Sequence, residues 1–177
     1  MTLLRESARD RETSAPAPGV IELPIRTTSS GFWSGEVNLD GLEKPANFIV
    51  DTGASISVVS AVLAARAGLE RFRQPGRINV YGAAGLAQDI QMLLLPRIVL
   101  GSTHTRQNVY AAVLDMEPIN ETAGFEQTGI VGGNVLRFYR VTFDFTRGIV
   151  RLEPLGAAAP GDEQKQKPQP PVVPSQS

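Results

Sequence analysis

The 177-residue sequence predicts a mostly β fold. Two observations carry this prediction. Short apolar runs, most of them five to eight residues long and rich in Val, Ile and Phe, recur along the chain. Gly, Pro, Asn or Asp bounds most of these runs, which is typical of strands joined by turns. Stretches with the helical period are few and short, so helices are expected to be minor elements.

The expected strands follow one another between residues 20 and 154. They are VIELPIR (20–26), FWSGEVNL (32–39), ANFIVDT (46–52), RINVYG (77–82), IQMLLLPRIVL (90–100), NVYAAVLDM (108–116), RVTFDFT (140–146) and GIVRLEP (148–154). The last two are expected to form a hairpin through Thr146-Arg147-Gly148. Alternation of apolar and polar residues in this hairpin predicts that Val141, Phe143 and Phe145 share one face.

A second hairpin is expected over residues 77–92, RINVYGAAGLAQDIQM. Its tip is Gly82-Ala83-Ala84-Gly85. Two glycines in four residues give such a tip freedom to move or to approach another backbone.

Two stretches predict short helices. Residues 60–69, SAVLAARAGL, begin with Ser60 as a possible cap, contain good helix formers and meet Gly68 as a stop. Residues 132–139, GGNVLRFY, are expected to add one or two helical turns.

The two ends of the chain differ from the middle. Residues 1–19 are polar and charged and show neither period, so a flexible N-terminal arm is expected. Residues 156–177 are rich in Pro, Gln and Lys, which predicts a disordered tail. Residues 20–155 are then the folded unit, long enough for one core of ordinary size.

Composition narrows the classes of function. The formal charge is −1 and 6% of the residues are aromatic, so no basic, aromatic surface for nucleic acid is expected. No apolar run approaches the roughly 20 residues that a membrane-spanning helix needs, which predicts a soluble chain. The absence of cysteine leaves the compartment open, either cytoplasmic or periplasmic.

Asp51 stands directly after the apolar run Phe48-Ile49-Val50 and before Thr52-Gly53. One interpretation is a turn in which the carboxylate accepts backbone N–H groups. Apolar residues on both sides make a plain turn less natural, because an ionised carboxylate is costly to bury without several donors. The alternative is a functional carboxylate.

Residues 48–55, Phe-Ile-Val-Asp-Thr-Gly-Ala-Ser, resemble the active-site loop of the aspartic proteases. A second element supports this resemblance: Ile130-Val131-Gly132, followed by GNVL, is similar to the run that crosses behind the catalytic loop in that family. The 82–85 tip lies between the two, where the family has its flap. The chain has one Asp-Thr-Gly and room for one lobe, so it resembles the retropepsin-like group, which has bacterial members.

This resemblance implies a single-lobe closed β fold with a flap hairpin and one or two short helices. It also implies roles for particular residues. The catalytic loop would be Asp51, Thr52 and Gly53; substrate would meet Ala54, Ser55, Tyr81, Gly82, Ala83, Ala84 and Gly85; Ile130, Val131 and Gly132 would support the loop. For Tyr81, a strand tyrosine packed on its neighbours is an equally good interpretation.

Peptide hydrolysis by carboxylates needs two of them, because one group cannot be acid and base at once. A homodimer would supply Asp51 from each copy across a two-fold axis. The predicted function is therefore an aspartic endopeptidase that binds protein or peptide substrate in extended form. The alternative is a peptide-binding or scaffold module on the same fold that does not cleave.

The chain departs from the retroviral pattern at three places. Viral members carry Asp where Ser55 stands and Arg where Gly133 stands, and these two pair as ions. Loss of both leaves no unpaired charge. Viral members also dimerise through short interleaved terminal strands, whereas long termini are present here; VIELPIR and IVRLEP are the candidates for that role.

Other chemistries find little support. A Ser–His catalytic pair would need His104, the only histidine, which is expected in an exposed turn. One His and no Cys supply no zinc site, and no calcium or nucleotide loop is recognisable. No metal and no cofactor are expected.

Overall fold

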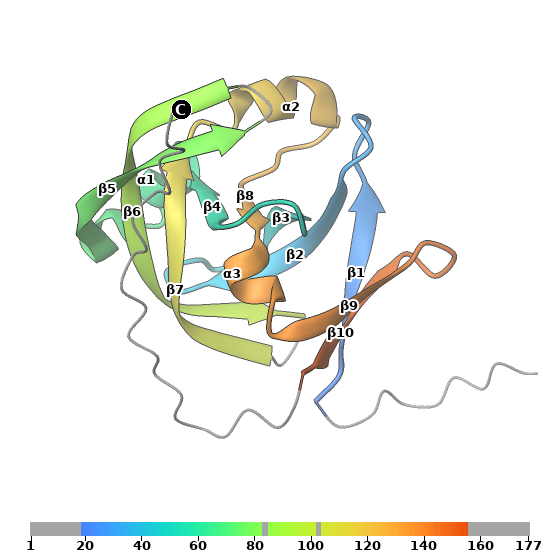
Figure 1. Ribbon diagram of the computed structural model, residues 1–177. Helices are drawn as coiled ribbons and strands as arrows, with labels where there is room; N and C mark the ends of the chain where they lie inside the picture. Colours follow the sequence, from blue (N-terminus) through green and yellow to red (C-terminus); the bar gives the residue numbers. More distant parts are fainter. Residues whose placement is uncertain (1–18, 83–84, 102–103, 156–177) are drawn as a thin grey trace, which may run out of the picture.

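The computed structural model describes residues 19–82, 85–101 and 104–155 (Figure 1). Within them, ten strands form one sheet with the order β5-β6-β7-β4-β8-β3-β2-β1-β10-β9. The mostly β prediction is confirmed. The strands are β1 Ile21–Thr27, β2 Trp33–Leu39, β3 Ala46–Val50, β4 Ser57–Ser60, β5 Arg73–Gly82, β6 Gly85–Leu100, β7 His104–Leu114, β8 Gly129–Val131, β9 Tyr139–Asp144 and β10 Ile149–Pro154.

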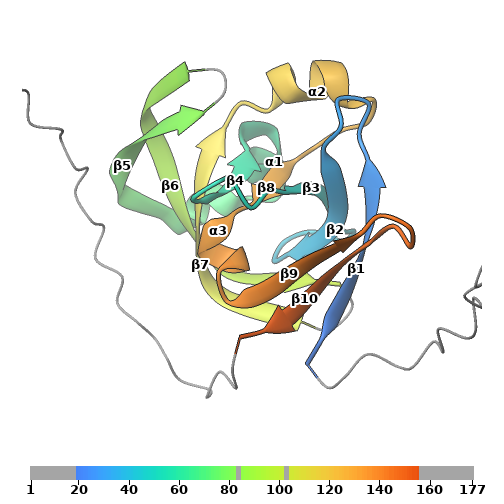
Figure 2. The same cartoon turned by 45° about the vertical axis from the view of Figure 1, so that its right-hand side comes forward.

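Strand β6 closes the sheet into a barrel. It has 16 residues and pairs with β5 at its start and with β7 along much of its length. Its last residues, Ile98 to Leu100, also pair with Leu39 to Val37 of β2. The order β6-β7-β4-β8-β3-β2 therefore returns to β6, and these strands surround a common interior (Figure 2).

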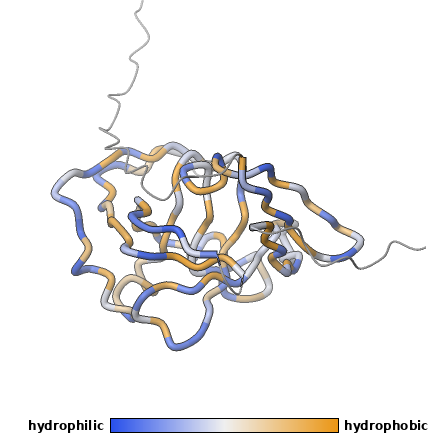
Figure 3. The backbone as a smooth tube through the Cα atoms, turned by 90° about the horizontal axis from the view of Figure 1, so that it is seen from below, coloured by the Kyte–Doolittle hydropathy of each residue, from blue (hydrophilic) through white to orange (hydrophobic). Residues whose placement is uncertain are grey.

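The interior is filled by aliphatic side chains from strands that are distant in sequence. Apolar and polar residues alternate along many strands of the tube in Figure 3. Such alternation turns one set of side chains into the core and the other to the surface. The largest apolar side chains that are almost fully buried are Leu23, Leu63, Leu69, Leu93, Leu100 and Leu152.

The expected helix at residues 60–69 is confirmed as α1, Ala61–Arg66. The Ser60 hydroxyl accepts a hydrogen bond from the N–H of Leu63, as an N-cap should. Gly68 follows in the left-handed conformation and starts a short 3-10 helix, η1 Leu69–Phe72. The expected turn after Gly132 is also present as α3, Gly133–Leu136.

A further helix, α2 Glu117–Ala123, was not expected. Strand β7 ends at Leu114, two residues before the predicted strand does. Pro118 stands in the first turn of α2, and Gly124 ends the helix with a positive φ of 81°. None of the helices among the described residues is long and apolar enough to cross a membrane.

The prediction for His104 is wrong. Instead of an exposed turn, it occupies the first position of β7, is partly buried, and hydrogen-bonds with the Tyr139 hydroxyl on β9. The residues before it, 102–103, lie outside the described part of the chain.

The two ends of the described chain pair with each other. Strand β1 pairs with β10 through Ile21 to Pro24 and with β2 through Ile25 to Thr27. The hairpin of β9 and β10 is present as expected, with Phe143 opposite Val150. The rings of Phe143 and Phe145 lie 5.9 Å apart, in keeping with their predicted common face.

Candidate active site

Asp51 follows the last residue of β3. Strand β3 is buried between β2 and β8 and runs parallel to β8, with Val50 opposite Val131. The N–H of Asp51 donates to the carbonyl of Val131, 3.1 Å away, so β8 extends the pairing to the first loop residue. The Asp51 side chain is partly exposed, and its Oδ1 accepts a hydrogen bond of 2.8 Å from the N–H of Gly53.

The segment that follows β8 lies directly against the loop. The N–H of Gly133 donates to the carbonyl of Ala54 at 2.6 Å, and the N–H of Asn134 donates to that of Ser55 at 3.1 Å. A Cβ at position 132 would lie 2.5 Å from the carbonyl oxygen of Ile56, which real side chains do not tolerate. Two of the three residues expected to support the loop, Val131 and Gly132, thus contact residues 50–56. The third, Ile130, pairs with Ile49 of β3 and Val58 of β4.

Two polar residues that sequence reasoning did not assign complete this support. The side-chain oxygen of Asn134 accepts from both the N–H and the hydroxyl of Ser57, and its amide nitrogen donates to the Tyr110 carbonyl. The Ser57 hydroxyl oxygen in turn accepts from the N–H of Gly132 at 3.1 Å. These bonds join the end of the loop, α3 and β7.

The other loop residues face outward. Thr52, Gly53 and Ser55 are exposed, and Ala54 is partly exposed. The Ser57 hydroxyl, by contrast, is used within the protein. The loop therefore offers one carboxylate and a small-residue surface to whatever contacts it from outside.

The β5–β6 hairpin carries the remaining expected site residues. Gly82 pairs with Gly85, and the side chains of Tyr81 and Leu86 beside them are 83% and 55% exposed. Ala83 and Ala84 lie outside the described residues. With respect to the described residues, the Tyr81 ring is therefore mostly exposed, which leaves it available for contacts outside the chain.

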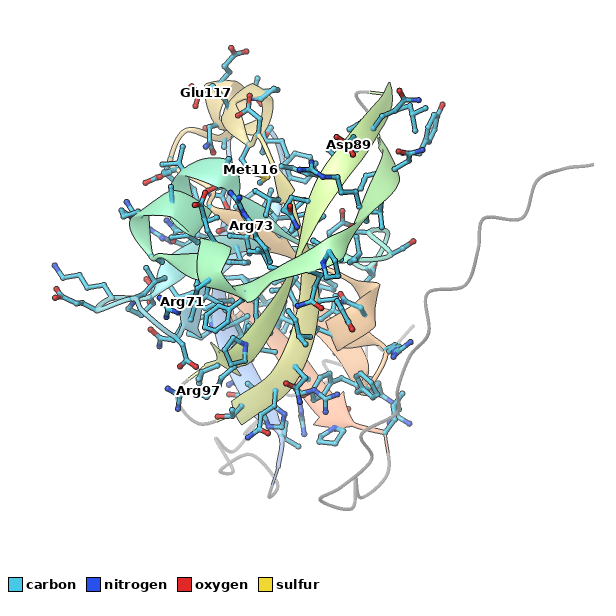
Figure 4. The ribbon with its side chains drawn as sticks, turned by 90° about the vertical axis from the view of Figure 1, so that its left-hand side faces the viewer. Arg71, Arg73, Asp89, Arg97, Met116 and Glu117 are labelled. Atoms are coloured by element: carbon cyan, nitrogen blue, oxygen red, sulfur yellow. The ribbon has the colours of Figure 1, made fainter. Side chains whose placement is uncertain are left out.

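The underside of this hairpin meets an apolar cluster next to the loop. Ile78, Val80 and Ile90 of the hairpin pack with a group of barrel residues and with the start of α2. In Figure 4, Met116 lies between α2, where Glu117 is labelled, and the hairpin, where Asp89 is labelled. The other members of the cluster are Ile49, Ile56, Val58, Met92, Ala112, Leu114, Ile119 and Ile130. The hairpin thus covers part of the apolar surface around residues 49–58.

The Ser–His alternative has no geometric support. His104 contacts Tyr139, and Ser57 contacts Asn134 and Gly132. Burial, together with the positive charge of Arg106, lowers the pKa of His104 below its usual 6.5.

Two other features of the described residues bear on the site. No group of three His, Cys, Asp or Glu side chains in the described ranges is close enough to hold a metal ion. A hollow of about 550 Å³ between α1 and α2 is lined by none of the expected site residues, although four carboxylates, Asp115, Glu117, Glu121 and Glu126, surround it.

Comparison with known proteins gives a family and a fold. Residues 35–135 match the family described as aspartyl protease, and the match includes the loop and the segment behind it. The fold is similar to a retropepsin-like aspartic protease from Rickettsia conorii, with a TM-score of 0.52 and 19% identity over 75% of this chain and 90% of that one. A second structure, a retroviral protease-like domain of Ddi1 from Leishmania major, has a TM-score of 0.47 and 16% identity over 71% of this chain and 96% of that one. No curated protein sequence matches the chain.

Proposed function

This chain belongs to the aspartyl protease family, with the fold of its retropepsin-like members, and we propose that it is an aspartic endopeptidase that works as a homodimer. Residues 20–155 would be the protease unit, preceded by an arm (1–19) and followed by a tail (156–177). The observation that carries the proposal is the position of Asp51, which directly follows a buried strand and begins a loop that is hydrogen-bonded to Gly133 and Asn134.

The surroundings of Asp51 suit a reacting carboxylate. Among the described residues its only hydrogen-bond donor is the N–H of Gly53, and it makes no ion pair. The carboxylate is partly exposed, so water can reach it and it needs no further donor from the protein. One carboxylate oxygen therefore remains for water or for a second acidic group.

The chemistry requires Asp51 from both copies. Two carboxyl groups held about 3 Å apart share one proton, because like charges that close do not both ionise readily. The ionised carboxylate takes a proton from a water molecule while the oxygen of that water attacks the peptide carbonyl carbon. The protonated group gives its proton to the carbonyl oxygen. Return of a proton to the amide nitrogen then lets the carbon–nitrogen bond break.

The remaining site residues would position substrate. Thr52 would bond across the two-fold axis, and Gly53 would let the substrate backbone approach without a Cβ in the way. Ala54 and Ser55 would line the loop. The substrate would lie extended as an added strand beneath the hairpin tips formed by Tyr81 and residues 82–85.

Cleavage of a mixed peptide library, followed by mass spectrometry with and without pepstatin, tests the proposal. Asp51→Asn should abolish cleavage, while sedimentation should still show a folded dimer. Asp115→Asn is the matched control, because Asp115 also accepts a bond from the N–H two residues on, that of Glu117 at 3.0 Å. The control should cleave at the wild-type rate.

Two results would contradict this function. Cleavage that persists in Asp51→Asn would exclude chemistry by this carboxylate. A verified dimer that leaves every peptide intact across the pH range would instead favour a peptide-binding module.

A further inference from the structure

Two apolar side chains are exposed next to each other where β9 begins and β10 ends. Phe138, which precedes β9, is 39% exposed, and Leu155, which follows β10, is 60% exposed. The N–H of Leu155 donates to the carbonyl of Phe138 at 2.9 Å, so these two residues continue the register of β9 and β10 by one pair. Opposite residues in an antiparallel pair project from the same face, which makes the two exposed side chains neighbours.

Arginine side chains surround this apolar pair. The guanidinium groups of Arg106 on β7 and of Arg137 lie 4.0 Å and 4.9 Å from the centroid of the Phe138 ring. Arg140 is exposed and stands two residues beyond Phe138, so it projects from the same side of the chain. We refer to Arg106, Arg137, Phe138, Arg140 and Leu155 together as the basal surface.

The basal surface keeps a net positive charge. Among the described residues, the five ion pairs all involve other arginines, so neither Arg106 nor Arg140 is paired with a carboxylate of this part of the chain. Glu153 stands opposite Arg140 in the ladder, but its carboxylate lies 3.3 Å from Arg151. The local charge is therefore positive although the whole chain has a formal charge of −1.

Both ends of the described chain leave the barrel beside the basal surface. Gly19 lies close to the end of β10, since a Cβ at this position would be 3.9 Å from the Pro154 ring. Figures 1 and 2 show the start of β1 and the end of β10 at the bottom of the barrel and the tip of the β5–β6 hairpin at the top. A contact made at the bottom therefore leaves the hairpin tip uncovered.

A lipid surface with anionic headgroups offers both kinds of contact that the basal surface can make. Guanidinium groups bind phosphate oxygens with two parallel hydrogen bonds. Anionic membranes also attract cationic side chains through their negative surface potential. Exposed Phe and Leu side chains gain free energy when they enter the boundary between headgroups and acyl chains. The combination of cationic and apolar side chains therefore fits such a surface in charge and in polarity.

The C-terminal tail of the same chain is a poorer match for the basal surface. It continues directly from Leu155 and contains two adjacent carboxylates, Asp162 and Glu163. Lys165 and Lys167 follow within four residues, so this stretch has no net charge with which to complement the arginines. It also offers no large apolar side chain beside its carboxylates. Charge and polarity together favour the lipid surface over the tail.

We propose that the basal surface binds anionic lipid membranes and that the folded unit rests on them with the tip of the β5–β6 hairpin on the far side. Phe138 and Leu155 enter the headgroup region, and the three arginines contact lipid phosphates. The binding is peripheral and reversible, because few side chains take part. This inference uses no residue of the loop at Asp51 or of the hairpin, so it is independent of the proposed function.

Co-sedimentation of the full chain with vesicles of phosphatidylglycerol and phosphatidylcholine in equal parts tests the charge requirement. The protein should bind these vesicles, less so at high salt, and should not bind vesicles of phosphatidylcholine alone. Arg140→Gln should weaken binding about fivefold, and Arg106→Gln combined with it about 25-fold. Arg71→Gln is the matched control, because Arg71 also lies over a ring, that of Phe72 at 4.6 Å, but on η1. It should bind as wild type does.

Leu155→Ser tests the apolar contact in the same assay. It should weaken binding to the anionic vesicles by about fivefold or more, because the side chain no longer gains from leaving water. Val62→Ser is the control, since Val62 is similarly exposed, at 66%, but lies on α1. Circular dichroism and thermal unfolding verify that every variant is folded. Peptide cleavage without lipid should be unchanged in Arg140→Gln and in Leu155→Ser.

Three results would overturn membrane binding through the basal surface. One is a wild-type protein that stays in the supernatant with anionic vesicles at low salt. Another is an Arg71→Gln protein that loses as much binding as Arg140→Gln, which would mean that no particular surface is used. The third is binding that appears only when Asp162→Asn and Glu163→Gln are combined, because the tail would then occupy the surface. None of these results affects the chemistry proposed for Asp51.

Discussion

Asn134 and Ser57 form a paired contact behind the candidate catalytic loop: one side-chain oxygen of Asn134 accepts both the N–H and the hydroxyl of Ser57, each at 2.8 Å. The same amide donates to the carbonyl of Tyr110 at 2.7 Å. A single side chain thereby sets the end of the loop relative to α3 and β7. Among the described residues, no hydrogen bond joins this side chain to Asp51.

Asn134→Ala should destabilise the protein and reduce cleavage. Loss of this amide leaves two part-buried groups of Ser57 and the exposed carbonyl of Tyr110 without their partner, and such a loss costs about 1–3 kcal/mol where water cannot reach the group. We expect a decrease of about 2 kcal/mol or more in the free energy of unfolding in urea. Asn79→Ala, which loses one exposed bond to the N–H of Asp89, should change it little.

Gly132→Ala should be among the most damaging small substitutions in the chain. Its Cβ would lie 2.5 Å from the oxygen and 2.6 Å from the carbon of the Ile56 carbonyl, and backbone cannot rotate away as a side chain can. Overpacking of this kind costs about 3 kcal/mol and displaces the loop. Gly82→Ala is the control, because a Cβ there meets nothing within 4 Å. Thermal unfolding of the two variants gives the comparison, and equal losses would contradict it.

Stability should fall on acidification through His104. Its pKa in the folded protein is lowered by burial and by Arg106, whereas the unfolded chain takes up this proton near the usual value of 6.5. Between the two pKa values the unfolded state binds more protons, so the free energy of unfolding decreases as pH falls below about 6.5 and levels off beneath the folded pKa. Urea unfolding of wild type and His104→Asn at a series of pH values measures the difference.

Tyr139→Phe is the informative companion variant for His104. It removes the hydrogen bond but keeps the ring, the burial and Arg106, which are the causes of the lowered pKa. The His104 contribution to the pH dependence should therefore persist in Tyr139→Phe. Its disappearance would mean that the hydroxyl, rather than burial, controls the protonation of this histidine.

Tyr81→Ala should raise KM without lowering stability. The ring is 83% exposed, so little packing is lost when it is removed, but a substrate beneath the hairpin would bury it. Burial of a large side chain is worth about 1.5–3 kcal/mol, which corresponds to an increase in KM of at least about tenfold. Val62→Ala, 66% exposed on α1, should alter neither KM nor the melting temperature. An unchanged KM for Tyr81→Ala would remove this residue from the substrate site.

Local patterns predicted most of the strands and α1 correctly, because burial on one face leaves a period that a single segment reveals. The sequence also predicted the start of α1 at Ser60 and its end at Gly68, because both signals act within a few residues. Helix α2 was missed although Pro118 and Gly124 marked both its ends. The apolar run before it favoured a strand to Met116, and only seven residues of helix followed.

What the sequence could not provide was pairing between distant segments. Asp51 was recognisable because its neighbours form a motif, whereas Ser57 and Asn134 are 77 residues apart and each is unremarkable alone. His104 was placed wrongly for the same reason, since its partner Tyr139 is 35 residues away. Closure of the barrel by Ile98 to Leu100 on β2 depends on a register that no single segment encodes.

The continuity of β6 restricts how the hairpin tip can move. Strand β6, from Gly85 to Leu100, forms one strand of the hairpin in its first half and one strand of the barrel in its second half. Its pairing with β5 is out of register around Pro75 and Gly76. We therefore expect the hairpin to stay fixed where β6 pairs with β7, and to bend near Pro75 and Gly76, where β5 and β6 are out of register. If peptide passes beneath this hairpin as proposed, a substitution that makes β5 regular there should slow peptide entry and release and leave the loop at residues 51–56 unchanged.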